Sequence, residues 1–422
     1  MEQKIYNEYV EILKEELLPA MGCTEPIAVA YAAAVAVQAL GEKPKSVEVN
    51  VSANIIKNVK SVVVPCTGGL RGIGAAVCAG IVAGCPEKEL EILEEITGEQ
   101  KVEMKKMLDT MPMTIRESDK EYIFDIQIKA CAGGHSGYVE IAGFHTNVIC
   151  VKKDDEIIRE KAYEEQGSSC ATDRSLLTVE KIIEFADCVD VADVEEVLQR
   201  QIDYNWAIAE EGMTGNWGAA IGKTLMEAYG NSVHNRAKAM AAAGSDARMN
   251  GCELPVVINS GSGNQGMTTS LPVIVYAKEL NVSKEMMLRA LVVSNLITIH
   301  MKTGIGRLSA YCGAISAGCG AGAGICYLYG GHAYEISHVI VNAVAINSGV
   351  VCDGAKASCA AKIASAVEAG LLGLQMQKNG KQFYGGDGLV EKGVENTIRN
   401  IGELAKKGMR ETDKTIIQIM TR

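Results

Sequence analysis

Two residue patterns divide this chain and limit the folds that it can adopt. Between Met113 and Ile157, the stretches "YIFDIQIKACA", "GYVEIAG" and "HTNVICVKK" have the composition of strands and predict a run of consecutive antiparallel strands. Beyond Leu176, almost every segment reads as a helix rich in Ala, Gly and Met. We therefore predict an α+β fold in which a large Ala/Gly-rich helical domain accompanies a smaller β-containing N-terminal domain.

A polar stretch over residues 161–175 predicts the boundary between these two parts. It gives a smaller α/β part over residues 1–170 and a helical domain over residues 175–422. The helices expected within residues 1–40 belong to the first part by sequence but could pack on the helical domain. The elements expected in the first part are helices over Ile5–Leu17, from Thr24 onward, Pro86–Thr97 and Glu99–Asp109, and strands over Val47–Val51 and Ser61–Val64.

Composition removes several classes of protein. The chain of 422 residues carries 41 basic and 52 acidic side chains without a basic run, so we expect no nucleic-acid partner. The uncharged stretch Cys312–Gly331 consists mostly of small residues, which favours a buried core helix over a membrane span. Such helices pack tightly within one chain or between two copies, so a homodimer is one expectation. Fourteen cysteines without a signal-peptide pattern indicate a reduced, cytoplasmic protein.

Three cysteines near the C-terminus, Cys312, Cys352 and Cys359, lie in Gly- and Ala-rich settings. Three thiolates from nearby segments suit an iron–sulfur cluster, and a cubane held at three corners keeps one iron open to substrate. In an unbroken helix, Cys352 and Cys359 would stand ~10 Å apart along the axis. Because Asp353 and Gly354 disfavour a helix interior, we predict a turn at Cys352 and a helix starting near residue 356. Three buried structural thiols are the alternative.

Three further cysteines are candidates for a ligand or a catalytic group. Cys319 and Cys326 follow Cys312 at intervals of about two helical turns, so they are competing ligands. Cys23, in "GCTEP", stands just outside a predicted helix whose N-cap is Thr24. A helix N-terminus stabilises a thiolate, which makes Cys23 a candidate base, nucleophile or fourth ligand, against the alternative of a buried turn cysteine.

Polar residues that could hold a substrate fall into three groups. The loop "INSGSGNQGMTTSLP" precedes an apolar helix and presents N–H groups that suit an anion such as a carboxylate. In "GSDARMNG", Asp246 and Arg248 either pair with each other or bind substrate. Strand-end residues that could line a pocket, or simply face solvent, are Ser52, Asn54, Lys57, Asn58, His145, Thr146 and Asn147.

These motifs together resemble a known family. "GCTEPIAVA", "NIIKN", "FHTNV", "SDARMNG", "NSGSGNQG", "RLSAYC" and "CDGAKASCA" follow the order and approximate spacing of the L-cysteine desulfidase family, which is related to the α part of iron–sulfur L-serine dehydratases. The resemblance runs from about Glu15 to Met420. One departure is Cys66 in "PCTGGLRG", where the family usually has Gly, and Cys66 is therefore not expected to be a ligand.

The resemblance implies a [4Fe-4S] cluster bound by Cys312, Cys352 and Cys359, no pyridoxal phosphate, and a catalytic base at Cys23. The implied reaction is β-elimination of L-cysteine to pyruvate, ammonia and hydrogen sulfide. The residues predicted to hold the carboxylate and amine of this small amino-acid substrate are Ser52, Asn54, Asn147, Ser260, Ser262, Asn264 and Gln265. Three alternatives stay open: L-serine dehydration at the same cluster, a pyridoxal-phosphate lyase suggested by "SGNQG", and a non-catalytic iron–sulfur sensor.

Overall fold

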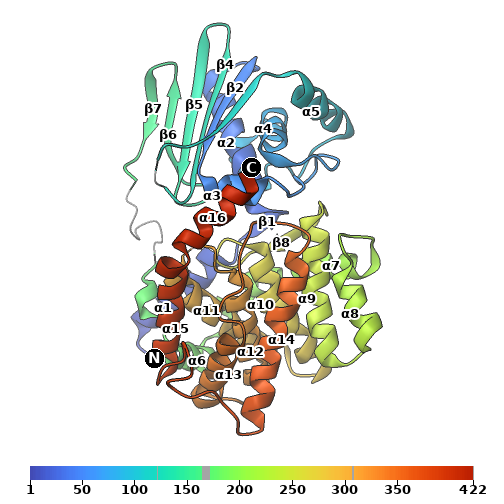
Figure 1. Ribbon diagram of the computed structural model, residues 1–422, viewed down its shortest axis with the longest axis vertical. Helices are drawn as coiled ribbons and strands as arrows, with labels where there is room; N and C mark the ends of the chain where they lie inside the picture. Colours follow the sequence, from blue (N-terminus) through green and yellow to red (C-terminus); the bar gives the residue numbers. More distant parts are fainter. Residues whose placement is uncertain (121, 164–171, 307, 422) are drawn as a thin grey trace.

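The computed structural model describes residues 1–120, 122–163, 172–306 and 308–421. It has two bodies, a mixed sheet with its covering helices at one end and a helical bundle at the other (Figure 1). Each body has its own large cluster of buried apolar side chains. The predicted α+β architecture with a large helical domain is confirmed. The predicted boundary at residue 170 lies outside the described residues and stays a prediction.

The α/β body is built on six strands in the order β3-β2-β4-β5-β6-β7. The strands are β2 (Ser46–Val51), β3 (Met113–Glu117), β4 (Asp125–Ala132), β5 (His135–Ala142), β6 (Val148–Lys153) and β7 (Glu156–Glu160). All neighbours pair antiparallel except β2 and β3, which are parallel. The accompanying helices are α2 (Thr24–Leu40), α3 (Ala53–Val59), α4 (Gly72–Ala83) and α5 (Gly98–Thr110). The predicted consecutive antiparallel strands are confirmed as β4, β5 and β6, whereas β3, at the start of the predicted range, pairs parallel with β2.

Helix α2 is the centre of this body because small residues let it approach both of its neighbours. It is buried on nearly all sides and packs between the sheet and α4. A Cβ atom at Gly80 of α4 would lie 1.9 Å from the carbonyl oxygen of Ala30, and one at Gly137 of β5 would lie 2.1 Å from that of Ala36. The neighbouring backbones therefore leave no room for larger side chains, and this close packing holds α2 in place. The N-terminus of α2 is one wall of the site described below.

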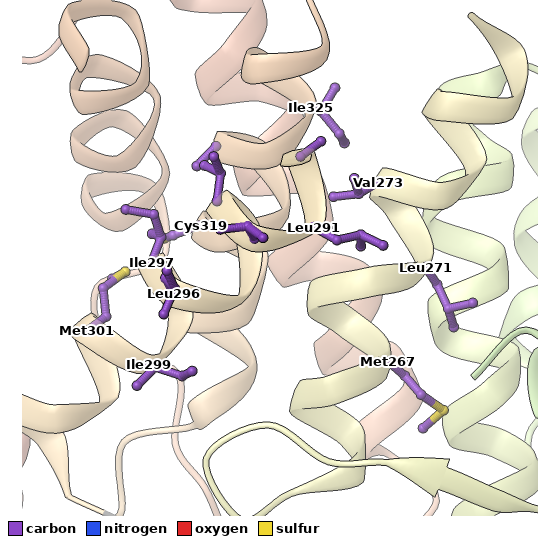
Figure 2. Close-up of a cluster of buried hydrophobic side chains, with 14 of the residues drawn as sticks. Met267, Leu271, Val273, Leu291, Leu296, Ile297, Ile299, Met301, Cys319 and Ile325 are labelled. Atoms are coloured by element: carbon purple, nitrogen blue, oxygen red, sulfur yellow. The ribbon is translucent and has the colours of Figure 1, made fainter. Parts of the chain in front are cut away.

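The second body is a bundle of helices. Its helices are α1 (Gln3–Glu16), α6 (Val179–Cys188), α7 (Glu195–Thr214), α8 (Ile221–Tyr229), α9 (Val233–Met249), α10 (Gly263–Glu279), α11 (Lys284–Ile305), α12 (Gly313–Leu328), α13 (Ala333–Ile346), α14 (Cys359–Lys378), α15 (Val394–Glu403) and α16 (Arg410–Thr421). Helices α10, α11 and α12 share a cluster of apolar side chains that includes Met267, Leu291 and Ile325 (Figure 2).

Helix α12 runs through the bundle as the buried core helix that the sequence predicts. Its glycines face two neighbours in turn: a Cβ at Gly318 would lie 2.2 Å from the carbonyl oxygen of Ala366 in α14, and one at Gly320 would lie 2.5 Å from that of Ser294 in α11. The small residues therefore serve helix-to-helix contact inside the chain. None of the described helices combines the length and apolar character that a membrane crossing requires.

Three elements link the two bodies. Strand β1 (Pro19–Met21), just before α2, pairs antiparallel with β8 (Pro255–Val257), just before α10. Helix α1 lies in the helical core although it precedes α2, which packs on the sheet. At the other end of the chain, α16 leaves the bundle and reaches α3 (Figure 1). The N-terminus of α2 and that of α10 are thereby held side by side.

The structure corrects three details of the predicted elements. Residues Ser61–Val64 form no strand, because Pro65 and two glycines with positive φ, Gly68 and Gly69, turn the chain back after one bridge between Val63 and Arg71. The helix predicted over Pro86–Thr97 is a short 3-10 helix, η1 (Pro86–Glu91), followed by turns. The helix after the turn at residue 352 starts at Cys359, three residues later than predicted.

Candidate functional site

A cavity of about 100 Å³ lies where the two bodies meet. Its walls come from the N-termini of α2, α10, α12 and α14, from α3, and from the ends of α9 and α11. Of the residues that the sequence singled out, those lining the cavity are Cys23, Lys57, Asn58, Arg248, Ser262, Asn264, Gln265, Cys312, Cys352 and Cys359. Seven of these ten come from the helical body, and the structure thus brings all three C-terminal cysteines to one cavity together with Cys23.

A short backbone ladder aligns the first two thiols. The N–H of Cys312 donates to the carbonyl of Val350 at 3.0 Å, and the N–H of Cys352 donates to that of Ala310 at 2.6 Å. Cys312 is the N-cap of α12, and its side chain meets that of Cys352 in a thiol–thiol hydrogen bond. The two cysteines are 40 positions apart in the sequence, and this antiparallel bridge is what makes them neighbours.

The third thiol reaches the cavity through a tight loop. Gly354 has φ +90°, a conformation that side chains with a Cβ rarely adopt, and it turns the chain between Cys352 and Cys359. A Cβ at this glycine would lie 2.3 Å from the carbonyl oxygen of Lys57 in α3. Cys359 then opens α14 with its thiol 3.7 Å from the carbonyl oxygen of Gly354. The predicted turn at Cys352 is therefore present. It also brings the loop between Cys352 and Cys359, called the cysteine loop below, into contact with the α/β body.

Burial, hydrogen bonding and nearby charges shift the pKa values of the three thiols in different directions. The pKa of Cys352 is lowered to about 6, first by the hydrogen bond from the Cys312 thiol and then by the positive charges of Lys57 and Lys302. The pKa of Cys312 is raised by that same hydrogen bond and by burial. Burial also raises the pKa of Cys359. Of the three thiols, Cys352 is therefore the one that loses its proton most readily.

The donor set fits an anionic metal–thiolate cluster. Among the described residues, the side chains at the cavity include one carboxylate, Glu25, and four cations, Lys57, Arg248, Lys302 and Lys362. Lys57 pairs with Asp413 and Lys362 pairs with Asp353. Positive surroundings lower the cost of placing thiolates and their cluster in a buried site. Within the described part of the chain, no three His, Cys, Asp or Glu side chains stand grouped around a point as ligands of a single ion. A cubane instead takes each thiolate on a separate iron, so its ligands stand farther apart than those of one ion.

Cys23 lines the same cavity from the start of α2, and Cys359 packs against the small apolar cluster to which Cys23 belongs. Cys23 is the N-cap of that helix, one residue earlier than predicted, and its thiol donates to the Glu25 carboxylate at 3.2 Å. Burial and the negative charge of Glu25 raise the pKa of Cys23 well above its usual value, against the lowering effect of Arg248. The predicted helix N-terminus is confirmed, whereas burial and Glu25 both act against the thiolate form that the sequence predicts for Cys23.

The Ser- and Gly-rich loop before α10 is a rigid turn. Asn259 and Ser262 exchange two backbone hydrogen bonds of 3.1 Å, and Ser260 and Gly261 between them both have positive φ. The Asn259 amide is held by Asn295 at 2.9 Å, so a buried amide network fixes the turn. The turn starts α10 with Ser262 as N-cap, and residues 262, 264 and 265 line the cavity.

Four of the predicted substrate-binding residues lie outside the lining of the cavity. The Ser52 hydroxyl donates to the Ile123 carbonyl at 3.0 Å, and the Ser260 hydroxyl donates to the Asn259 side chain at 2.9 Å. The Asn147 amide donates to the Ala142 carbonyl at 2.8 Å. Asn54 lies in α3 one turn before Asn58, which donates to its carbonyl at 2.9 Å. Each of these groups contributes to local structure, and the substrate role predicted for them stays a prediction.

Sequence reasoning missed Lys302 and Tyr311, which both line the cavity. Lys302 ends an apolar stretch of α11 in which no other Lys, Arg, Asp or Glu occurs after Arg289, and such an isolated charge was the available signal. Tyr311 is 1% exposed and its hydroxyl has no hydrogen-bond partner among the described residues. Nothing in the sequence pattern distinguishes this tyrosine from a core aromatic. Cys319 and Cys326 are buried in the bundle and do not line the cavity.

The fold and site together define a class: an α+β protein with three thiols and a fourth, that of Cys23, at a buried, cation-lined cavity. The family model for the serine dehydratase alpha chain matches residues 87–418. A UPF0597 protein of Desulfitobacterium hafniense (strain Y51) is 59% identical, over 99% of this chain and 97% of its own length. Those of Lachnoclostridium phytofermentans and Treponema denticola are 50% and 43% identical, with at least 99% of each chain covered. The chain belongs to the serine dehydratase alpha-chain family, which confirms the predicted relation to that group.

Proposed function

We propose that this protein is an iron–sulfur-dependent lyase that converts L-cysteine and water to pyruvate, ammonia and hydrogen sulfide. The observation that carries the proposal is the convergence of Cys312, Cys352 and Cys359 on one cavity that Cys23 also lines. The family match supports a lyase of the serine dehydratase kind. The cysteine content supports a reduced, cytoplasmic setting.

The three thiols would hold a [4Fe-4S] cluster. When bound, the cluster would supply a Lewis-acidic iron for the leaving group, and soft iron favours a sulfur ligand. The protein supplies the rest. The lysines and arginine of the cavity would stabilise the negative charge of thiolates and substrate.

In this proposal, Cys23 is the group that transfers the proton. As a thiolate it takes the α-proton of the substrate while the C–S bond breaks, which yields aminoacrylate. Glu25, which accepts the Cys23 proton in a hydrogen bond of 3.2 Å, is placed to take that proton first. Aminoacrylate then tautomerises and is hydrolysed to pyruvate and ammonia without further help from the protein. The sulfur leaves as hydrogen sulfide with the proton that Cys23 received.

A second candidate is dehydration of L-serine at the same site. The name of the matched family favours it, and the residues of the cavity distinguish poorly between a thiol and a hydroxyl leaving group. The test is to isolate the protein without oxygen and to compare sulfide release from L-cysteine with pyruvate formation from L-serine. We expect kcat/KM to be higher for L-cysteine. A preference for L-serine would replace our proposal with dehydration, and absence of both activities in cluster-loaded protein would overturn both.

A further inference from the structure

Arg248 is a buried cation at the wall of the cavity. It ends α9 in the helical body, is 2% exposed, and lines the cavity. Its Nε–H donates to the carbonyl of Gly22 at 2.8 Å. Among the described residues, no acceptor meets its Nη groups and no carboxylate pairs with it. Asp246, its neighbour in sequence, instead accepts from the backbone N–H of Ile221 at 2.6 Å and so holds the start of α8.

A buried guanidinium without a counter-charge indicates an anion that binds there. Desolvation makes such a charge costly, and an anion in the same cavity relieves that cost. The planar guanidinium offers its two Nη groups in the geometry of a carboxylate, which it can bind through two parallel hydrogen bonds. The sequence also makes room for it: a Cβ at Gly263 would lie 2.5 Å from Nε and 2.9 Å from Cζ of Arg248.

The complementary half of the cavity presents hydrogen-bond acceptors. The side-chain nitrogen of Asn264 donates to the sulfur of Met249 at 3.6 Å, and its Oδ1 atom is buried without a partner among the described residues. The same is true of Oε1 of Gln265, which is 6% exposed and packs against Gly313 at the start of α12. Two amide oxygens without donors suit an ammonium group, which has donors only.

The geometry points to a receptor for the two charged ends of a free α-amino acid: Arg248 takes the carboxylate, and the amide oxygens of Asn264 and Gln265 take the ammonium. This inference rests on the proposed function and specifies the substrate class, an amino acid with an unmodified carboxylate. It moves carboxylate binding from the backbone of the Ser- and Gly-rich loop to Arg248.

Arg248 also holds the carbonyl of Gly22, next to Cys23, so a purely structural role must be distinguished from carboxylate binding. The test measures sulfide release from L-cysteine and from L-cysteinamide by cluster-loaded wild-type protein and by Arg248→Gln and Arg248→Lys. We expect wild type to favour L-cysteine by roughly 100-fold or more in kcat/KM, and Arg248→Gln to reduce this preference to less than about 10-fold, mainly through KM. Arg236→Gln, at a partly exposed arginine outside the lining of the cavity, is the matched control.

A second measurement does not depend on turnover. Calorimetry with L-alanine, which has both charged ends but no leaving group, should show binding to wild type and to Arg236→Gln, and none to Arg248→Gln. Equal losses of rate on both substrates with the preference unchanged, or unaltered L-alanine binding by folded Arg248→Gln, would overturn the inference. If the protein binds L-alanine through Arg248 but releases neither sulfide nor pyruvate, the proposed function fails and the receptor stands. Arg248→Lys, which keeps the charge, serves if the glutamine variant does not fold.

Discussion

The two bodies of the molecule contribute unlike groups to the same cavity. The helical body supplies the three thiols Cys312, Cys352 and Cys359, with the rigid loop before α10. The α/β body supplies Cys23 and Glu25 at the start of α2, and Lys57 from α3. Each body has its own apolar core. From this difference we infer that the helical body binds the cluster and the α/β body transfers the proton. Mutations in one body should therefore abolish cluster binding, and mutations in the other should abolish proton transfer alone.

The largest expected effect is on the helical side. Cys352→Ala removes the thiol with the lowered pKa, and we expect loss of the cluster absorption between roughly 350 and 450 nm together with all measurable turnover. The matched control is Cys319→Ala, seven residues into α12 from Cys312 and buried in the bundle. It should keep the colour and lose only about 1 kcal/mol of stability. Equal loss of colour in both variants would mean that the bundle, rather than the cavity, holds the iron.

On the α/β side, Cys23→Ala should keep the colour and lose turnover. Removing a general base lowers kcat by about 10²- to 10⁴-fold. The measurement is kcat with L-cysteine together with iron content, in the variant and in wild type prepared side by side. Colour loss in Cys23→Ala would instead make Cys23 a cluster ligand and would break the division of labour between the two bodies.

Gly354 is where the cysteine loop presses on the α/β body. Gly354→Ala places a Cβ against the carbonyl of Lys57 in a backbone conformation with φ +90°, so we expect a loss of about 2–4 kcal/mol in unfolding free energy and weaker retention of iron. Gly349→Ala is the control, since a Cβ there meets nothing within 4 Å. Denaturant unfolding of both variants checks this, and equal stabilities would show that the contact carries no strain.

A smaller effect is expected where α16 meets α3. Lys57 has a side chain that is 1% exposed, and it pairs with Asp413 at 2.5 Å. Asp413→Asn removes the counter-charge but keeps a hydrogen-bond acceptor, so we expect a loss of about 1–3 kcal/mol by thermal unfolding. Glu411→Gln, on the same helix but in the exposed pair with Lys414, should change stability by less than about 0.5 kcal/mol. Similar losses of unfolding free energy in the two variants would mean that the buried pair does not stabilise the contact between the two bodies.

The sequence predicted the fold class and the group of cysteines, because both depend on local pattern. Strand composition marks β4, β5 and β6, and the turn-forming Asp353 and Gly354 separate Cys352 from α14. Prediction from the sequence failed for properties that depend on contacts between distant parts of the chain. Desolvation of Cys23 depends on what covers it, and the positions of Lys302 and Tyr311 at the cavity depend on helix packing. The ladder that joins Cys312 to Cys352 likewise leaves no mark on either segment alone.

The central claim is that three thiols from the helical body hold one cubane cluster in the cavity between the bodies. Counting iron and acid-labile sulfide in protein isolated without oxygen tests this most directly. We predict about four irons and about four sulfides per chain. Protein that turns over L-cysteine at full rate with no acid-labile sulfide would contradict the claim.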